Sequence, residues 1–294
     1  MTFLKSELSI PAILGACLML PVLAFTSTYS VAEDVPPGER VLSVGGSVTE
    51  IIYALGEEDR LVARDTTSSY PPEVMDLPDV GYMRALSPEG VLSVNPDLVI
   101  AEAGSGPPET IEVLEEAAID FVAVPDGFDR DTVRAKIEAV AAALDVVEKG
   151  EALAAEVDAA LADAMSAEVP GTPKRVMFVL TAQGGRIMAS GTNTTADGII
   201  RLAGAVNAVE GFEGYKPVSE EAIIAAAPDV ILMMDRGGDH AMTDDDLFAL
   251  PSVAATPAGE TRSVVRIDGL LLLGFGPRTP EAVRTLHGAL YGGA

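Results

Sequence analysis

The sequence contains an internal repeat, which restricts the chain to a duplicated architecture. The segment from Ser87 to Ile100 aligns without gaps on the segment from Ser219 to Leu232, at an offset of 132 residues. A second pair of segments, Arg40-Val-Leu and Arg175-Val-Met, recurs at an offset of 135 residues. Two nearly equal offsets indicate a repeated structural unit. The sequence therefore predicts two similar lobes.

Short β-branched runs alternate with helical segments in each copy. After the run Arg40–Val44 the chain breaks at Gly45-Gly46, and Ser47 with Glu50 predicts a capping box that opens a helix ending at Gly56. Strands that alternate with helices favour a parallel sheet with helices on both faces. The predicted fold class is therefore α/β, with two Rossmann-like lobes built on parallel sheets.

The middle of the chain has helical spacing and no strand signal. The pair Lys149-Gly150 predicts a join between two helices in this region. A helix of about 20 residues spans ~30 Å, the diameter of a small domain, so the second helix is expected to link the lobes. Its apolar residues recur every four positions, at Leu153, Val157, Leu161 and Met165.

These patterns predict the domain boundaries. We expect an N-terminal α/β lobe over residues 33–143, a linking helix over 144–169 and a C-terminal α/β lobe over 170–294. Domains of about 100–150 residues are common, so each lobe has the length to bury its own core.

Residues 1–32 have the pattern of a secretory signal peptide. Lys5 precedes an apolar run from Ala12 to Phe25, and Ser30-Val31-Ala32 is a small-residue cleavage site. We therefore expect export to the periplasm. Cys17 ends a Leu-Gly-Ala-Cys segment that resembles a lipoprotein box, so lipid anchoring at Cys17 stays an alternative.

Charge and cysteine content exclude several classes of function. With 45 acidic and 19 basic side chains the net charge is −26, which argues against binding to nucleic acid or anionic lipid. Removal of residues 1–32 takes away Cys17, which is the only cysteine, and with it any disulfide or thiolate nucleophile. The sequence has two histidines and no G-x-S-x-G or H-E-x-x-H motif, so a secreted hydrolase is the weaker hypothesis and we expect no enzyme.

Three separated segments carry a resemblance to a known family. They are Asp65-Thr-Thr-Ser-Ser-Tyr70-Pro71, Leu77-Pro-Asp-Val-Gly-Tyr-Met-Arg84-Ala-Leu-Ser and Leu273-Gly-Phe-Gly-Pro-Arg278-Thr-Pro. The chain from Arg40 onward resembles the periplasmic substrate-binding proteins of ABC importers for cobalamin, siderophores and haem, and these segments resemble the haem-binding branch. The resemblance implies a class III periplasmic binding protein, in which a long helix joins two lobes that hold the ligand between them.

Tyr70 is the expected iron ligand. It stands where the haem-binding branch carries its tyrosine, and a phenolate is a recognised axial ligand of haem iron. The resemblance thus implies that Tyr70 binds haem b, which is the transported ligand. The alternative is that the Tyr70 ring only packs on the prolines of its turn, and a siderophore or cobalamin carrier of the same fold stays the second hypothesis.

Arginines are the expected partners of the haem. The resemblance implies that Arg236 reaches the phenolate or a propionate, with a surface arginine before a glycine turn as the alternative. Some relatives carry an arginine two residues after the tyrosine, where this chain has Pro72, which leaves Arg84 and Arg278 as further candidate cations. His240 is a possible sixth ligand, although a lone loop histidine is more often solvated.

Glu89 and Glu221 occupy equivalent positions in the two copies of the internal repeat. The resemblance implies that each contacts arginines on the inner-membrane ABC permease, so that a monomeric binding protein docks at two points. The alternative is that each carboxylate only stabilises a helix N-terminus, by about 0.3–1 kcal/mol. Both roles are compatible.

Overall fold

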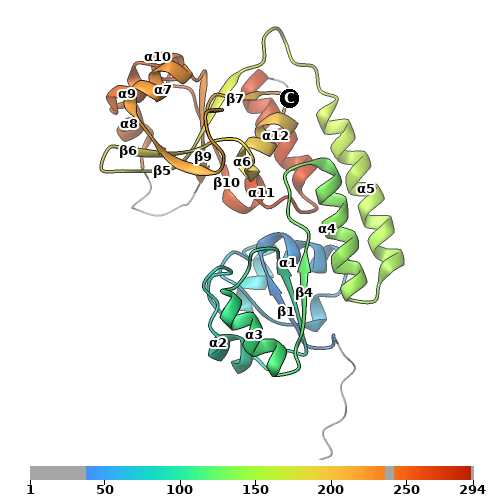
Figure 1. Cartoon of the computed structure of the whole chain (residues 1–294). Coiled ribbons are helices and arrows are strands. Elements are labelled where there is room, and N and C mark those ends of the chain that lie inside the picture. Colours follow the sequence, from blue (N-terminus) through green and yellow to red (C-terminus); the bar gives the residue numbers. More distant parts are fainter. Residues whose placement is uncertain (1–37, 236–241, 293–294) are drawn as a thin grey trace, which may run out of the picture. The chain divides into compact units, whose positions relative to one another are not determined.

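The computed structural model describes residues 38–235 and 242–292 (Figure 1). The predicted signal peptide, Cys17, Arg236 and His240 lie outside the described residues. Within the described ranges, no helix combines the length and the hydropathy that a membrane crossing needs.

The first half of the chain forms a four-stranded parallel sheet. Its strand order is β2-β1-β3-β4, and every neighbouring pair is parallel. The strands are β1 (Val41–Val44), β2 (Leu61–Arg64), β3 (Leu98–Glu102) and β4 (Asp120–Val124). Between them lie α1 (Gly46–Ala54), η1 (Glu58–Arg60), η2 (Pro72–Asp76), α2 (Pro88–Ser93) and α3 (Pro108–Glu116).

Helices cover both faces of this sheet, as the alternating pattern predicts. Val41 and Ile100 belong to an apolar cluster that includes residues of α1 and of the later helix α4 (Arg130–Ala143). Their neighbours Leu42 and Val99 point to the opposite face and pack in a second cluster with Val91 of α2 and residues of α3. This alternation follows from the period of two along a strand.

The second half forms a six-stranded mixed sheet in the order β10-β9-β5-β6-β8, with β7 pairing to β5. The strands are β5 (Arg175–Gln183), β6 (Arg186–Ser190), β7 (Val206–Asn207), β8 (Tyr215–Val218), β9 (Val230–Asp235) and β10 (Val264–Asp268). The helices are α6 (Thr195–Leu202), α7 (Glu220–Ala226), α8 (Asp244–Phe248), α9 (Pro251–Ala254), α10 (Pro257–Thr261), α11 (Gly269–Leu273) and α12 (Thr279–Tyr291).

The expectation of two parallel sheets holds for the first sheet and for only part of the second. Strands β5, β9 and β10 are parallel, but β6 is antiparallel to both β5 and β8. Gly184 and Gly185 separate β5 from β6 and have φ of 58° and 76°. Two successive positive φ values are what a two-residue hairpin turn requires, so this Gly-Gly pair was a hairpin signal in the sequence.

The duplicated unit is visible in matching hydrogen bonds. Asp97 accepts the backbone N–H of Arg40 at 3.1 Å, and Asp229 accepts the backbone N–H of Arg175 at 2.8 Å. The Arg40 side chain donates to the carbonyl of Val94 at 2.7 Å, and the Arg175 side chain donates to the carbonyl at the equivalent position 226 at 3.0 Å. The internal repeat in the sequence therefore corresponds to the same hydrogen bonds at the start of a strand in each lobe.

Two helices connect the sheets. Helix α4 ends at Ala143 and α5 (Val147–Met165) begins after a turn with Asp145 at φ 58°, so the prediction of a join at Lys149-Gly150 was wrong. Gly150 has another role: a Cβ atom there would lie 2.2 Å from the Cβ of Ala141, so glycine lets α5 approach α4 closely. Helix α5 packs on α4 and contacts α12 (Figure 1). The domain boundaries stay predictions.

Candidate functional site

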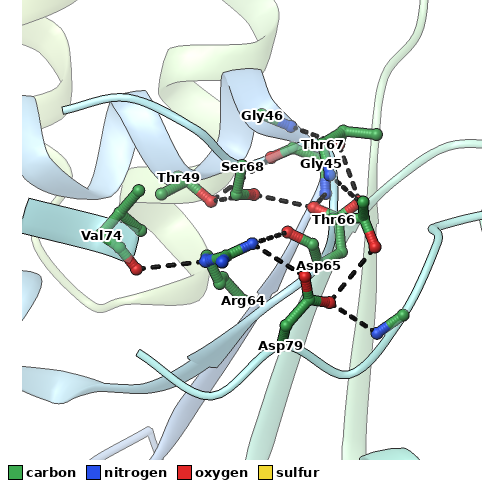
Figure 2. A network of polar contacts seen from close by, with 11 residues as sticks. Gly45, Gly46, Thr49, Arg64, Asp65, Thr66, Thr67, Ser68, Val74 and Asp79 are labelled. Carbon is green, nitrogen blue, oxygen red and sulfur yellow. Dashed lines mark hydrogen bonds and ion pairs between the residues drawn. The ribbon is translucent and has the colours of Figure 1, made fainter. Parts of the chain in front are cut away.

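The loop after β2 is held rigidly against the start of α1 (Figure 2). The buried carboxylate of Asp65 accepts hydrogen bonds from the backbone N–H of Gly45 at 2.9 Å and from the hydroxyls of Thr67 and Ser68 at 2.7 Å each. The Thr67 hydroxyl accepts the N–H of Gly46 at 3.1 Å. These bonds fix the segment that leads to Tyr70.

The same contacts correct the predicted capping box. Gly45 is the N-cap of α1 with φ 108°, and no side chain caps the helix as an N-cap residue. The first N–H groups are satisfied instead by Asp65 and Thr67, about 20 residues further along the chain. Ser47 and Glu50 are thereby free for other contacts, and both make them.

Tyr70 meets a cation from the second half of the chain. The guanidinium carbon of Arg278 lies 3.6 Å from the centroid of the Tyr70 ring, well within the range of a cation–π contact. Tyr70 remains 41% exposed. Arg278 immediately precedes α12, so the contact joins the two halves of the chain at the tyrosine.

Glu50 anchors the arginine. The Arg278 guanidinium donates a hydrogen bond to Glu50 of α1 and forms an ion pair with it. Burial raises the pKa of Glu50, and the hydrogen bond and charge of Arg278 oppose that rise. The Nε of Arg278 is buried without a hydrogen-bond partner among the described residues. The geometry thus holds one cation against both a buried carboxylate and the Tyr70 ring.

A cavity of about 850 Å³ lies between the two halves, and we call it the inter-lobe cavity. Its size falls within the usual range of small-molecule sites. The wall combines apolar side chains, such as Met83, Leu180 and Leu273, with hydroxyl and charged groups. Ser69 and Arg84 line the cavity; Tyr70, the neighbour of Ser69, is not among the described lining residues.

Two tyrosines other than Tyr70 line the inter-lobe cavity, and the sequence analysis did not single them out. Tyr82 is 45% exposed, and the Tyr215 hydroxyl is 3.1 Å from that of Thr195. Tyr82 lies within the second of the three segments that resemble the haem-binding branch, so the sequence offered a signal for it. Tyr215 gave no comparable signal.

Lys136 is a second residue that the sequence analysis missed. Lys136 lines the cavity although it is only 2% exposed, and its ammonium lies 3.5 Å from the Glu102 carboxylate. It also donates to Ser47 Oγ at 3.4 Å and to the carbonyl of Gly274 at 3.3 Å. A buried charge needs such partners to offset its desolvation. The available signal was a lysine on the apolar stripe of a helix.

The other predicted residues have different positions. Glu89 and Glu221 are exposed on α2 and α7 and do not line the cavity. His287 of α12 lies 3.1 Å from the carbonyl of Ala203, which is an ordinary structural contact. Across the described ranges, no group of three or more histidine, cysteine or acidic side chains has the arrangement of a metal site.

Two α/β units, connected by helices α4 and α5 and lining one cavity, have the architecture of the class III periplasmic binding proteins. The chain belongs to the periplasmic binding protein family, whose model matches residues 41–270.

The chain is similar to several solved structures and curated proteins. The chain is similar to the periplasmic heme-binding protein BhuT in complex with two hemes, with 46% identity, a TM-score of 0.82 and coverage of 86% of this chain and 98% of that one. For the periplasmic heme-binding protein RhuT from Roseiflexus sp. RS-1 the identity is 40%, the TM-score 0.82 and the coverage 87% and 98%. The Vitamin B12-binding protein of Vibrio parahaemolyticus is 30% identical over 234 residues, which cover 79% of this chain and 81% of that protein.

Proposed function

We propose that this chain is a periplasmic haem-binding protein that holds haem b in the inter-lobe cavity, with Tyr70 as axial ligand, and delivers it to an inner-membrane ABC permease. The observation that carries this proposal is the Arg278 guanidinium stacked on the Tyr70 ring, directly after Ser69, which lines the cavity. Two relatives at 40% identity or more are described as heme-binding proteins, which supports the same ligand class.

The surroundings of Tyr70 suit an oxygen ligand for ferric iron. A phenolate carries negative charge, and the guanidinium of Arg278 supplies the opposite charge against the ring face. The apolar wall residues suit the faces of a porphyrin, while Arg84 and Lys136 are cations in the cavity wall for carboxylates of the ligand. Haem supplies the iron, and the protein supplies its ligand, its charge balance and its apolar surroundings.

The test is a haem titration of the wild type, Tyr70→Phe and Tyr82→Phe, followed by the visible bands of the iron. We expect Tyr70→Phe to lose the tyrosinate–iron band and to weaken haem binding by tenfold or more, which is about 1.4 kcal/mol or more. Tyr82→Phe is the matched control, because Tyr82 is 45% exposed and lines the cavity. We expect it to retain the band.

Two results would contradict the proposal. Loss of the tyrosinate–iron band in Tyr82→Phe and its retention in Tyr70→Phe would show that Tyr82 and not Tyr70 binds the iron. The absence of any haem-dependent absorption change in the wild type would remove haem as the ligand.

Cobalamin is the second candidate ligand. The 30% identical relative is described as a Vitamin B12-binding protein. Calorimetric titration with cyanocobalamin separates the two hypotheses, because we expect measurable heat only with haem.

A further inference from the structure

Tyr70 lies in a loop that leaves the edge strand β2 of the first sheet and returns beside it. The loop covers residues 65–79 and includes the short helix η2, and we call it the Tyr70 loop. Tyr70 is 41% exposed, so packing around its side chain restrains it only in part. The position of its phenol therefore depends on how the loop backbone is held.

Arg64, the last residue of β2, closes the Tyr70 loop through its backbone. Its N–H donates to the carbonyl of Pro78 at 3.0 Å, and its carbonyl accepts the N–H of Val80 at 2.9 Å. These bonds place Arg64 beside Asp79 in a parallel bridge. The two ends of the loop thus meet at one residue.

The Arg64 side chain then reaches into the loop that its backbone closes (Figure 2). Its Nε donates to the carbonyl of Val74 at 3.2 Å, and its Nη1 donates to the carbonyl of Asp65 at 3.1 Å. Nη1 also forms an ion pair with the Asp79 carboxylate at 3.1 Å. A planar guanidinium can serve several acceptors because its donors point in fixed directions. One side chain therefore holds backbone that precedes Tyr70 and backbone that follows it.

This guanidinium is buried, which strengthens its hold on the loop. Arg64 is only 6% exposed, so water competes little for the two carbonyls that it binds. The Asp79 carboxylate, which offsets the buried charge, also accepts the N–H of Gly81 at 2.8 Å and the Thr66 hydroxyl at 3.2 Å. The contacts of Arg64 thus belong to a network that spans both ends of the loop.

We propose that Arg64 is a positioning residue for Tyr70, whose guanidinium fastens the Tyr70 loop in the conformation that presents the phenol to the iron. This inference rests on the proposed function, because it takes Tyr70 as the iron ligand. A loop that is ordered before the ligand arrives spares binding the cost of ordering it. Removal of a group that orients a metal ligand typically lowers metal affinity about 10–100-fold.

The experiment compares haem titrations of Arg64→Met and Arg40→Met, each with its stability measured by urea denaturation. Arg40 is the matched control, because its guanidinium also donates to two backbone carbonyls of the first lobe, those of Val94 at 2.7 Å and Asn95 at 2.6 Å. We expect both variants to be less stable than the wild type. Only Arg64→Met should weaken haem binding by about tenfold or more and reduce the tyrosinate–iron band at saturating haem.

Hydrogen exchange of the haem-free protein measures the order of the loop directly. We expect the backbone amides of residues 65–79 to exchange at least about tenfold faster in Arg64→Met and at the wild-type rate in Arg40→Met. Arg64→Lys keeps the charge beside Asp79 but lacks the fork that serves two carbonyls, so its haem affinity should lie between those of the wild type and Arg64→Met.

The possible results separate this inference from the function on which it rests. Wild-type haem affinity and an unchanged band in Arg64→Met would overturn the positioning role and leave Tyr70 as the iron ligand. Equal losses of haem affinity in Arg64→Met and Arg40→Met would also overturn it, because they would report a general loss of stability. Retention of the band in Tyr70→Phe would overturn the proposed function itself.

Discussion

Arg278 is the residue on which the candidate site depends. It pairs with buried Glu50, stacks on Tyr70 and comes from the opposite half of the chain, 228 positions from its carboxylate partner. Breaking a buried ion pair costs more than forming it stabilises, because the remaining charge has no partner. Removal of either charge is therefore expected to destabilise the fold as well as to change the contact at Tyr70.

Replacement of Arg278 is expected to destabilise the protein strongly. Arg278→Ala leaves the Glu50 carboxylate buried without its cation, and we expect a loss of about 3 kcal/mol in the free energy of unfolding, measured by urea denaturation. Addition of Glu50→Gln to this variant should recover part of the loss, because the unpaired charge is removed.

Arg284 of α12, the helix that Arg278 precedes, provides the control. It pairs with Asp163 at 3.1 Å, and both side chains are largely exposed. Arg284→Ala should cost less than about 1 kcal/mol, as exposed pairs do. Equal losses in the free energy of unfolding from Arg278→Ala and Arg284→Ala would show that the Arg278–Glu50 pair contributes no more than an exposed ion pair.

Helices α4 and α5 form the structural link between the two sheets. The Glu57 carboxylate, close after α1, accepts from Lys149 of α5 at 2.5 Å, and the Arg60 side chain donates to the carbonyl of Leu144 at 2.8 Å. Gly150 sets the distance between α4 and α5, since no side chain fits between its Cα atom and Ala141. The link is thus a close-packed helix pair tied to the first lobe.

Gly150→Ala tests this packing. Alanine favours a helix over glycine by about 1 kcal/mol, but the added methyl would overlap Ala141 and force the helices apart. Because overpacking costs about 1–3 kcal/mol, we expect a net loss of stability, seen as a lower melting temperature. Gly211→Ala is the control, since a Cβ there meets no atom within 4 Å. A rise in melting temperature for Gly150→Ala would refute the close approach.

One apolar cluster extends across both lobes, beside a separate cluster in each lobe. A single cluster contains Ile100 of the first sheet, Ile137 of α4, Leu161 of α5 and Phe178 of the second sheet. Lys136 adds polar contacts to Ser47 on one side and to Gly274 on the other. The two lobes are therefore connected by packing as well as by the chain.

Thermal unfolding is expected to occur in one transition. Because the apolar cluster is continuous, unfolding of either lobe exposes part of the other. Differential scanning calorimetry should give equal calorimetric and van't Hoff enthalpies, which is the test for two-state unfolding. Two resolved transitions would instead show that the predicted lobes at residues 33–143 and 170–294 unfold independently.

The duplicated α/β architecture was readable from the sequence, because its signals are local. The internal repeat that begins at Ser87 and Ser219 predicted matching helices. The alternation of apolar runs with helical segments predicted a sheet with helices on both faces. The antiparallel β6 was missed although Gly184-Gly185 signalled its hairpin. The helix join was misplaced because Gly150, read as a break, serves helix packing.

The sequence by itself determined the repeated lobes, the helical link and the acidic residues Glu89 and Glu221 on matched helices. Only the tertiary structure decided that Arg278 meets Tyr70 and Glu50, and that Lys136 lines the cavity. Periodicity and capping act over a few residues and leave a trace in the sequence. Contacts between residues 200 or more positions apart depend on how the two lobes pack, and no local pattern encodes that.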